Sequence, residues 1–168
     1  MALIHTQNEG GVMESLFVIL LAAIESNFMS IPFLQNWTEK LIDILESPPD
    51  WLIDLTMCFD SDEALNVLRK NLVLSGEVLD DEKYGGILVG FFYLSYLNKK
   101  ISFQKFQSEI LDVIDAYEIE NLDIEEIGPI FETEPDIEGL LLKRFEKYGE
   151  KSNVLYSYLI SQVERAGI

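Results

Sequence analysis

The sequence contains little basic charge, one cysteine and one histidine. Its 168 residues include 12 Lys and Arg against 30 Asp and Glu, so the formal net charge at pH 7 is −18. Because affinity for phosphates comes from Lys and Arg, we expect no nucleic-acid partner. Cys58 has no second cysteine with which to form a disulfide, and His5 alone cannot build a metal or catalytic site that needs several histidines.

Long apolar runs are also missing. The two most apolar stretches, residues 15–24 and 84–97, are shorter than the roughly 20 residues that a bilayer span needs. No basic residue precedes the first stretch, since the first one is Lys40, so we expect no secretory signal peptide. These features predict a cytoplasmic protein with no membrane partner, and the single thiol agrees with that location.

Helical patterns dominate what is present. Hydrophobic residues make up 48% of the chain, and many recur at intervals of three and four, as do Leu34, Trp37 and Leu41. We find no convincing alternating strand. The sequence therefore predicts an all-α fold, a single compact array of about seven or eight mostly antiparallel helices that forms one domain over residues 1–168.

Capping residues indicate where several helices begin. Ser30, Asp60 and Ser102 each precede an apolar stripe, and their side-chain oxygens can accept a hydrogen bond from the first helical turn. The first helix is expected over residues 12–27. In the short helix after the Pro-Pro pair, Met57 is expected among the residues that fill the core.

Two helices are expected near the C-terminus. The first covers residues 136–148, with Lys143, Arg144 and Lys147 near its C-terminal end, where positive charge suits the helix dipole. The second is a last helix that Ser152 caps.

Gly86 and Gly90 stand four residues apart within an expected helix. A glycine in a helix interior costs about 1 kcal/mol relative to alanine, so a compensating contact is expected. Small residues at this spacing let a second helix approach closely. We expect a packing groove in the core, against the apolar first helix, and a dimer contact is the alternative.

Acidic residues concentrate in one stretch. Residues 106–142 contain 12 Asp and Glu and no basic residue, which is two-thirds of the net charge. Such a surface speeds the encounter with a positively charged partner, although it can also serve solubility alone. Apolar residues between the acids, among them Ile119, Leu122 and Ile127, either anchor that partner or face the core. The predicted partner-binding residues are Glu118, Glu120, Asp123, Glu125, Glu126, Glu132, Glu134, Asp136 and Glu138.

Clustered carboxylates also raise the alternative of a metal-dependent hydrolase. Four of them recur at every third position over residues 109–118, so on a helix they diverge around the polar side, whereas Mg²⁺ needs several oxygens in one cavity. Residues 60–63 look like the start of a calcium loop, but Asn71 stands where the final acid belongs. No phosphate loop or serine nucleophile elbow occurs. We therefore predict no enzymatic activity, no metal and no cofactor.

The segment 47–55, with the sequence SPPDWLIDL, carries a resemblance to a known class. It is similar to the proline–tryptophan helix start of one helical family among the bacterial toxin-immunity proteins, and the chain resembles that class in size, acidity and helical content. Such proteins are cytoplasmic inhibitors that protect a cell from a secreted toxin. The resemblance implies direct binding that blocks the active site or cleft of a toxin, and it carries over no residue by position.

These observations together predict a non-enzymatic acidic protein-binding protein. We expect an immunity-type inhibitor of a basic bacterial toxin, such as a nuclease, whose basic cleft the acidic stretch occupies in place of substrate phosphates. The expected partner is a basic protein, with a homodimer left open. One alternative is a structural or oligomerising helical domain, and the other is a carboxylate-based metal-dependent hydrolase.

Overall fold

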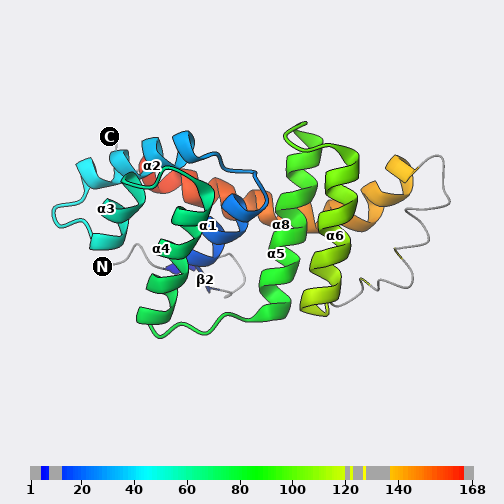
Figure 1. Cartoon of the computed structure of the whole chain (residues 1–168), viewed down its shortest axis with the longest axis horizontal. Coiled ribbons are helices and arrows are strands. Elements are labelled where there is room, and N and C mark those ends of the chain that lie inside the picture. Colours follow the sequence, from blue (N-terminus) through cyan, green and yellow to red (C-terminus); the bar gives the residue numbers. More distant parts are fainter. Residues whose placement is uncertain (1–4, 8–12, 120–121, 123–126, 128–136, 165–168) are drawn as a thin grey trace. The chain divides into compact units, whose positions relative to one another are not determined.

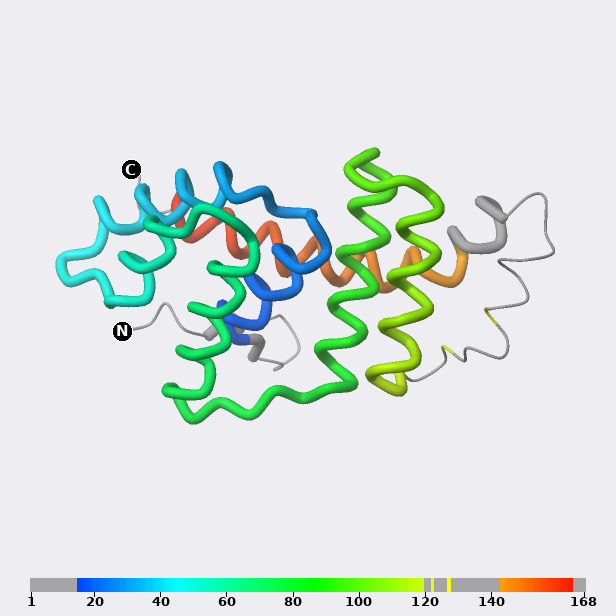
Figure 2. The backbone as a smooth tube through the Cα atoms, viewed as in Figure 1, coloured from blue at the N-terminus to red at the C-terminus, as the bar shows by residue number. Residues whose placement is uncertain are grey.

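The protein is all-α, as the sequence predicts. The computed structural model describes residues 5–7, 13–119, 122, 127 and 137–164, and this part of the chain forms seven helices and two strands of three residues each (Figures 1 and 2). None of the described helices has the length and apolar content that crossing a bilayer requires.

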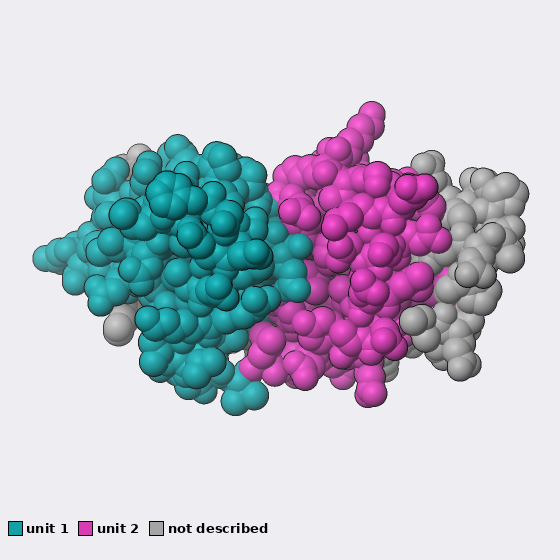
Figure 3. Space-filling view, viewed as in Figure 1, with its two compact units in different colours: residues 1–25, 29–78, 155–168 teal, residues 26–28, 79–154 magenta. Residues whose placement is uncertain are grey.

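Contacts within the chain divide it into two compact units. The first unit comprises residues 1–25, 29–78 and 155–168, and the second comprises residues 26–28 and 79–154 (Figure 3). One domain over residues 1–168 stays a prediction.

The first unit is built around a buried apolar helix. It contains β1 (His5–Gln7), β2 (Met13–Ser15), α1 (Leu16–Glu25), α2 (Ile31–Ile44), α3 (Asp50–Thr56), α4 (Ser61–Leu74) and the C-terminal part of α8 (Ile137–Glu164). Nine of the ten α1 residues are buried, and α1 packs against α4 while α2 packs against α3. The Trp37 indole N–H donates to the Leu159 carbonyl at 3.0 Å, which joins α2 to α8.

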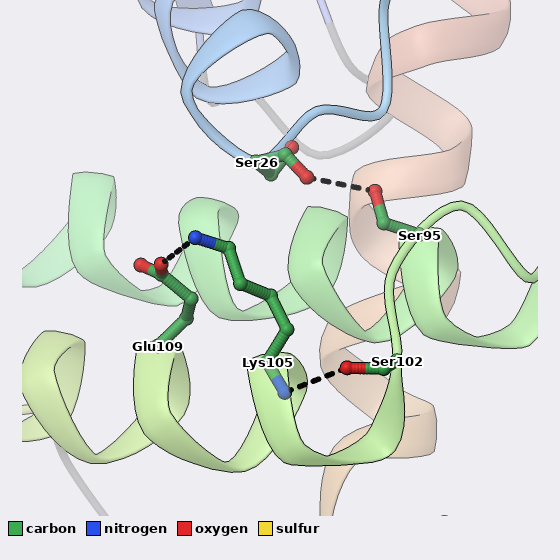
Figure 4. A network of polar contacts seen from close by, with 5 residues as sticks. All are labelled: Ser26, Ser95, Ser102, Lys105 and Glu109. Atoms are coloured by element: carbon green, nitrogen blue, oxygen red, sulfur yellow. Dashed lines mark hydrogen bonds and ion pairs between the residues drawn. The ribbon is translucent and has the colours of Figure 1, made fainter.

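The second unit is built on aromatic contacts. It contains α5 (Asp81–Leu97), α6 (Phe103–Tyr117) and the N-terminal part of α8, with α5 and α6 side by side as a hairpin (Figure 2). Phe106 of α6 and Phe145 of α8 are fully buried and meet edge to face, with 5.6 Å between ring centroids. Ser95 Oγ donates to the Ser26 carbonyl at 3.0 Å, which ties residues 26–28 to α5 (Figure 4).

The predicted helix caps are confirmed. Ser30, Asp60 and Ser102 each accept the backbone N–H of the residue three positions later, at 3.4, 2.9 and 3.1 Å. One turn after the Ser102 cap, Lys105 Nζ pairs with Glu109 Oε1 at 2.8 Å (Figure 4). The local sequence is therefore sufficient to start α2, α4 and α6.

The first helix is shorter than predicted. It begins at Leu16 rather than at residue 12, because Met13–Ser15 pairs antiparallel with His5–Gln7. Ser15 Oγ then accepts the Phe17 N–H at 3.1 Å. Three residues per strand are too few for an alternating pattern to be recognised in the sequence.

The C-terminal region forms one helix, so the predicted break between residues 148 and 152 is wrong. Helix α8 runs without interruption from Ile137 to Glu164. Ser152 is buried in its interior and donates its hydroxyl to the Ile87 carbonyl at 2.9 Å, instead of capping a helix. Gly149 remains helical because it packs closely on α5, where a Cβ atom would lie 2.6 Å from Tyr93 Cδ1.

Gly90 provides the close approach that the sequence predicts, but the approaching helix is α8 and not the first helix. A Cβ atom on Gly90 would overlap with Ser152 Oγ and with the Tyr148 carbonyl. A Cβ atom on Gly86 would stand 3.5 Å from the Tyr148 ring, which is an ordinary contact. Only the second of the two glycines is therefore required by the packing of α5 against α8.

We expect Gly90→Ala to destabilise the protein and Gly86→Ala to leave it as stable or more stable. Alanine improves helix propensity by about 1 kcal/mol at either position. At Gly90 the added methyl forces α8 away from α5, and overpacking of this kind typically costs about 1–3 kcal/mol. Urea denaturation followed by circular dichroism measures both free energies of unfolding. Equal stability of the two variants would contradict the packing described for Gly90.

Candidate functional site

Three exposed apolar side chains lie on α3 and on the turn that follows it. Ile53, Met57 and Phe59 are 45%, 70% and 86% exposed. Ile53 lies within α3, and Met57 is the C-cap residue that directly follows this helix. Aromatic residues and Met are enriched where proteins bind one another. This end of α3 therefore has the apolar groups of a protein-binding surface.

The prediction that Met57 helps fill the core is wrong. The buried side chains of α3 are those of Trp51, Leu52 and Leu55, and the next inward side chain is that of Cys58. Met57 follows the last helical residue, where the direction of the chain turns its side chain outward. The sequence pattern alone extends the apolar stripe by one residue too many.

Hydrogen bonds fix the backbone of the turn that carries these side chains. Gln35 Nε2 on α2 donates to the Cys58 carbonyl at 2.8 Å. The Phe59 N–H donates to Glu63 Oε2 at 2.7 Å, and the Glu63 N–H in turn donates to Asp60 Oδ1 at 2.9 Å. A turn held in this way loses little conformational entropy when a partner binds.

Acidic residues are frequent in the sequence on both sides of the exposed apolar side chains. Between Lys40 and Arg69 the chain has seven acids and no basic residue, and all seven are exposed. They are Asp43, Glu46, Asp50, Asp54, Asp60, Asp62 and Glu63. We call these seven acids, together with Ile53, Met57 and Phe59, the α3–α4 surface.

Helix stability accounts for part of this acidity. Asp50 begins α3, Asp60 caps α4, and Asp62 and Glu63 lie in the first turn of α4, where negative charge favours the helix dipole. Asp43, Glu46 and Asp54 have no such position. Helix stability therefore does not account for these three acids.

The pKa of the Cys58 thiol reflects the negative electrostatic potential at this surface. Its side chain is buried, and Sγ donates to the Asp54 carbonyl at 3.4 Å. Burial raises the pKa of the Cys58 thiol above its ordinary value. The carboxylates of Glu63, Asp54 and Asp60 raise that pKa further, because a thiolate would be repelled by each of them.

The acids that the sequence proposes for partner binding lie almost entirely outside the described residues. Glu118 is described: it is exposed and ends α6 with a left-handed backbone, at φ 46°. The backbone of Glu138 lies in the first turn of α8. The others, which fall outside the described residues, are Glu120, Asp123, Glu125, Glu126, Glu132, Glu134 and Asp136.

Three of the apolar residues between those acids face inward. Ile119, Leu122 and Ile127 are 6%, 6% and 1% exposed. The interpretation of these three as core residues is therefore confirmed. In the part of the chain that the structure describes, no group of three or more His, Cys, Asp or Glu side chains is arranged to hold a metal ion.

The α3–α4 surface was missed because its acids are interrupted by apolar core residues. The sequence does contain a signal for this surface: the 28 residues between Lys40 and Arg69 include no basic residue. What the sequence could not reveal is that Met57 and Phe59 point outward on either side of the inward Cys58.

We expect the Cys58 thiol to ionise only at a pH above that of an exposed cysteine, and Asp54→Asn to lower its pKa. The reason is that the substitution removes one of the repelling charges, while the hydrogen bond from Sγ is made to the unchanged backbone carbonyl. Because Cys58 is the only cysteine, the ultraviolet absorbance of the thiolate against pH measures this directly. A matched control is Glu39→Gln on α2, which should leave the pKa unchanged. Equal effects of the two substitutions would contradict a local potential.

Comparison with known proteins adds no family assignment. No protein-family model, no curated protein and no solved structure matches this chain. The resemblance to toxin-immunity proteins therefore stays a prediction. Any functional conclusion must rest on the exposed groups of the α3–α4 surface and on the charge of the chain.

Proposed function

We propose that this protein is a non-enzymatic protein-binding protein, an immunity-type inhibitor that blocks a basic bacterial toxin by direct contact. The observation that carries the proposal is the α3–α4 surface, where Met57 and Phe59 are 70% and 86% exposed among seven acids and no base. A contiguous exposed apolar patch with a polar rim is typical of a surface that a partner covers. Its acidic border specifies a basic partner.

The apolar side chains would supply most of the binding free energy. Complete burial of a Phe or Met side chain is worth about 1.5–3 kcal/mol. A few such anchors, surrounded by a polar rim that excludes water, typically dominate an interface. Phe59 is held by the Glu63 hydrogen bond to its N–H, so its position is set before the partner arrives.

The acids would supply speed and selectivity of association. A net charge of −18 attracts a basic surface from a distance of about one Debye length, roughly 8 Å at physiological salt. Complementary charge raises the association rate constant more than it slows dissociation. The acidic residues over 118–138 would add to the same attraction. We expect the acidic surface to bind in the basic cleft of the toxin, where substrate phosphates bind.

The test begins with the proteins that neighbouring genes encode. We expect one of them to be a basic toxin that stops growth when it is expressed alone and is harmless when it is expressed with this chain. Isothermal titration calorimetry then gives the dissociation constant of the pair. If no neighbouring product is neutralised, the proposal is wrong.

We expect Phe59→Ala to weaken binding to that toxin by about tenfold or more, which corresponds to about 1.4 kcal/mol. The control is Leu74→Ala, which removes a similarly exposed apolar side chain at the end of α4, where Leu74 is 71% exposed. It should change the dissociation constant less than twofold, because it lies outside the α3–α4 surface. Similar losses in both variants would contradict the proposed anchor.

We expect the pair Asp43→Asn and Asp54→Asn to slow association and to reduce its dependence on salt. Neither acid lies at the N-terminus of a helix, so the folded state should not suffer. Stopped-flow fluorescence at several salt concentrations measures the association rate constant, with Glu39→Gln as the control. Association that is unchanged at low salt would remove the role of these charges.

A further inference from the structure

Five of the chain's 12 Lys and Arg gather on one groove of the second unit. The groove has a volume of about 740 Å³, and Lys83, Lys143, Arg144, Lys147 and Lys151 line it. Two carboxylates, those of Asp80 and Glu82, are also present. The groove therefore carries net positive charge in a chain whose net charge is −18.

Lys143, Arg144 and Lys147 do not lie at the C-terminal end of a helix, so the favourable contact with a helix dipole that the sequence predicts does not apply to them. A helix that ended at residue 148 would place Lys143, Arg144 and Lys147 beside its negative C-terminal end. Helix α8 continues to Glu164, so the three residues lie in its interior, where the dipole has no effect on them. The helix dipole therefore does not account for the positive charge along this part of α8.

Lys143, Lys147 and Lys151 form a row along α8. They are four residues apart and all are exposed, so neighbours in the row are about 6 Å apart and the row is about 12 Å long. Lys83 in the first turns of α5 also lines the groove. Cations from two helices therefore border one elongated groove.

The base of the groove is apolar. Ile87, Ile119 and Leu122 lie there and are 2%, 6% and 6% exposed. One of the two acids in the groove, Asp80, caps α5. Its Oδ1 atom accepts the backbone N–H of Lys83 at 3.1 Å. An apolar base lowers the local dielectric constant and strengthens attraction between the lysines and an anion.

We propose that this groove binds an extended acidic peptide segment of a partner protein, with carboxylates at alternate positions. In an extended chain the side chains on one face are about 6.6–6.8 Å apart, which matches the spacing of about 6 Å in the lysine row. About four to five extended residues cover the whole row. The proposal is independent of the proposed function, because it concerns the other unit and a partner of opposite charge.

An acidic peptide fits the surroundings of the groove better than a nucleic acid does. A nucleic-acid strand carries a phosphate charge about every 3.4 Å along its whole length. Beyond the row of about 12 Å, those charges would meet a chain with 30 Asp and Glu. A short acidic segment places its charge only where the lysines are.

The test uses the full chain and three fluorescent probes. The first probe is a peptide of about eight residues that alternates Glu and Ser, a length that covers the row with a margin. The second has the same composition with all Glu residues contiguous, and the third is an oligothymidylate of equal charge. We expect fluorescence anisotropy at low salt to show the tightest binding for the alternating peptide. Tighter binding of the oligothymidylate, or no binding of either peptide, would overturn the proposal.

Two triple variants of equal charge separate the groove from the overall charge. We expect Lys143→Gln, Lys147→Gln and Lys151→Gln together to weaken binding of the alternating peptide at least about tenfold, since each exposed pair contributes up to about 1 kcal/mol, or about fivefold. The control neutralises Lys40, Arg69 and Lys70, which are exposed in the first unit.

The control triple variant should bind the peptide within about twofold of the unaltered chain, since none of these three residues lines the groove. Equal weakening by both triples would overturn the proposal. Failure here is distinguishable from failure of the proposed function, because the groove triple should still neutralise the toxin and Phe59→Ala should still bind the peptide.

Discussion

The close approach of α8 to α5 is the contact on which the second unit depends. It exists because Gly90 and Gly149 have no side chain, so Ser152 can reach the Ile87 carbonyl and the Tyr93 ring can lie on the α8 backbone. The same approach fixes the rotation of α8 about its axis. Phe145 then faces inward, while Lys143, Lys147 and Lys151 remain exposed along the groove. A packing requirement thereby sets the geometry of a charged surface.

In the α3–α4 surface, by contrast, the exposed acids and exposed apolar side chains lower the stability of the fold. Seven exposed acids without a base repel one another, and part of that cost is offset where Asp60 caps α4 and where Glu63 accepts the Phe59 N–H. Cys58 is buried within this surface, and its raised thiol pKa follows from both burial and the neighbouring carboxylates. Asp43, Glu46 and Asp54 have no comparable role in capping or starting a helix.

Each unit therefore presents a surface of different character. The first has apolar anchors with an acidic border, and the second has a basic groove over an apolar base. The predicted acidic stretch over residues 118–138 contributes buried apolar residues at Ile119, Leu122 and Ile127, so part of that segment belongs to the core.

The sequence by itself determined the elements whose causes are local. Ser30, Asp60 and Ser102 begin helices because a side-chain oxygen three residues from an amide is enough to cap it, and periodic apolar residues were enough to predict the all-α class. The sequence also contained the charge distribution, since charge requires only counting.

Only the tertiary structure decided the features that depend on contacts between distant residues. Ser152 looks like the cap of a new helix, yet α5 packs against Gly149 and Ser152 within one continuous helix, α8. Met57 looks like a core residue, yet the inward positions of this segment are filled by Leu55 and Cys58. The physical reason is the same in both cases: local propensities differ by about 1 kcal/mol, and burial of one side chain or one close helix contact outweighs them.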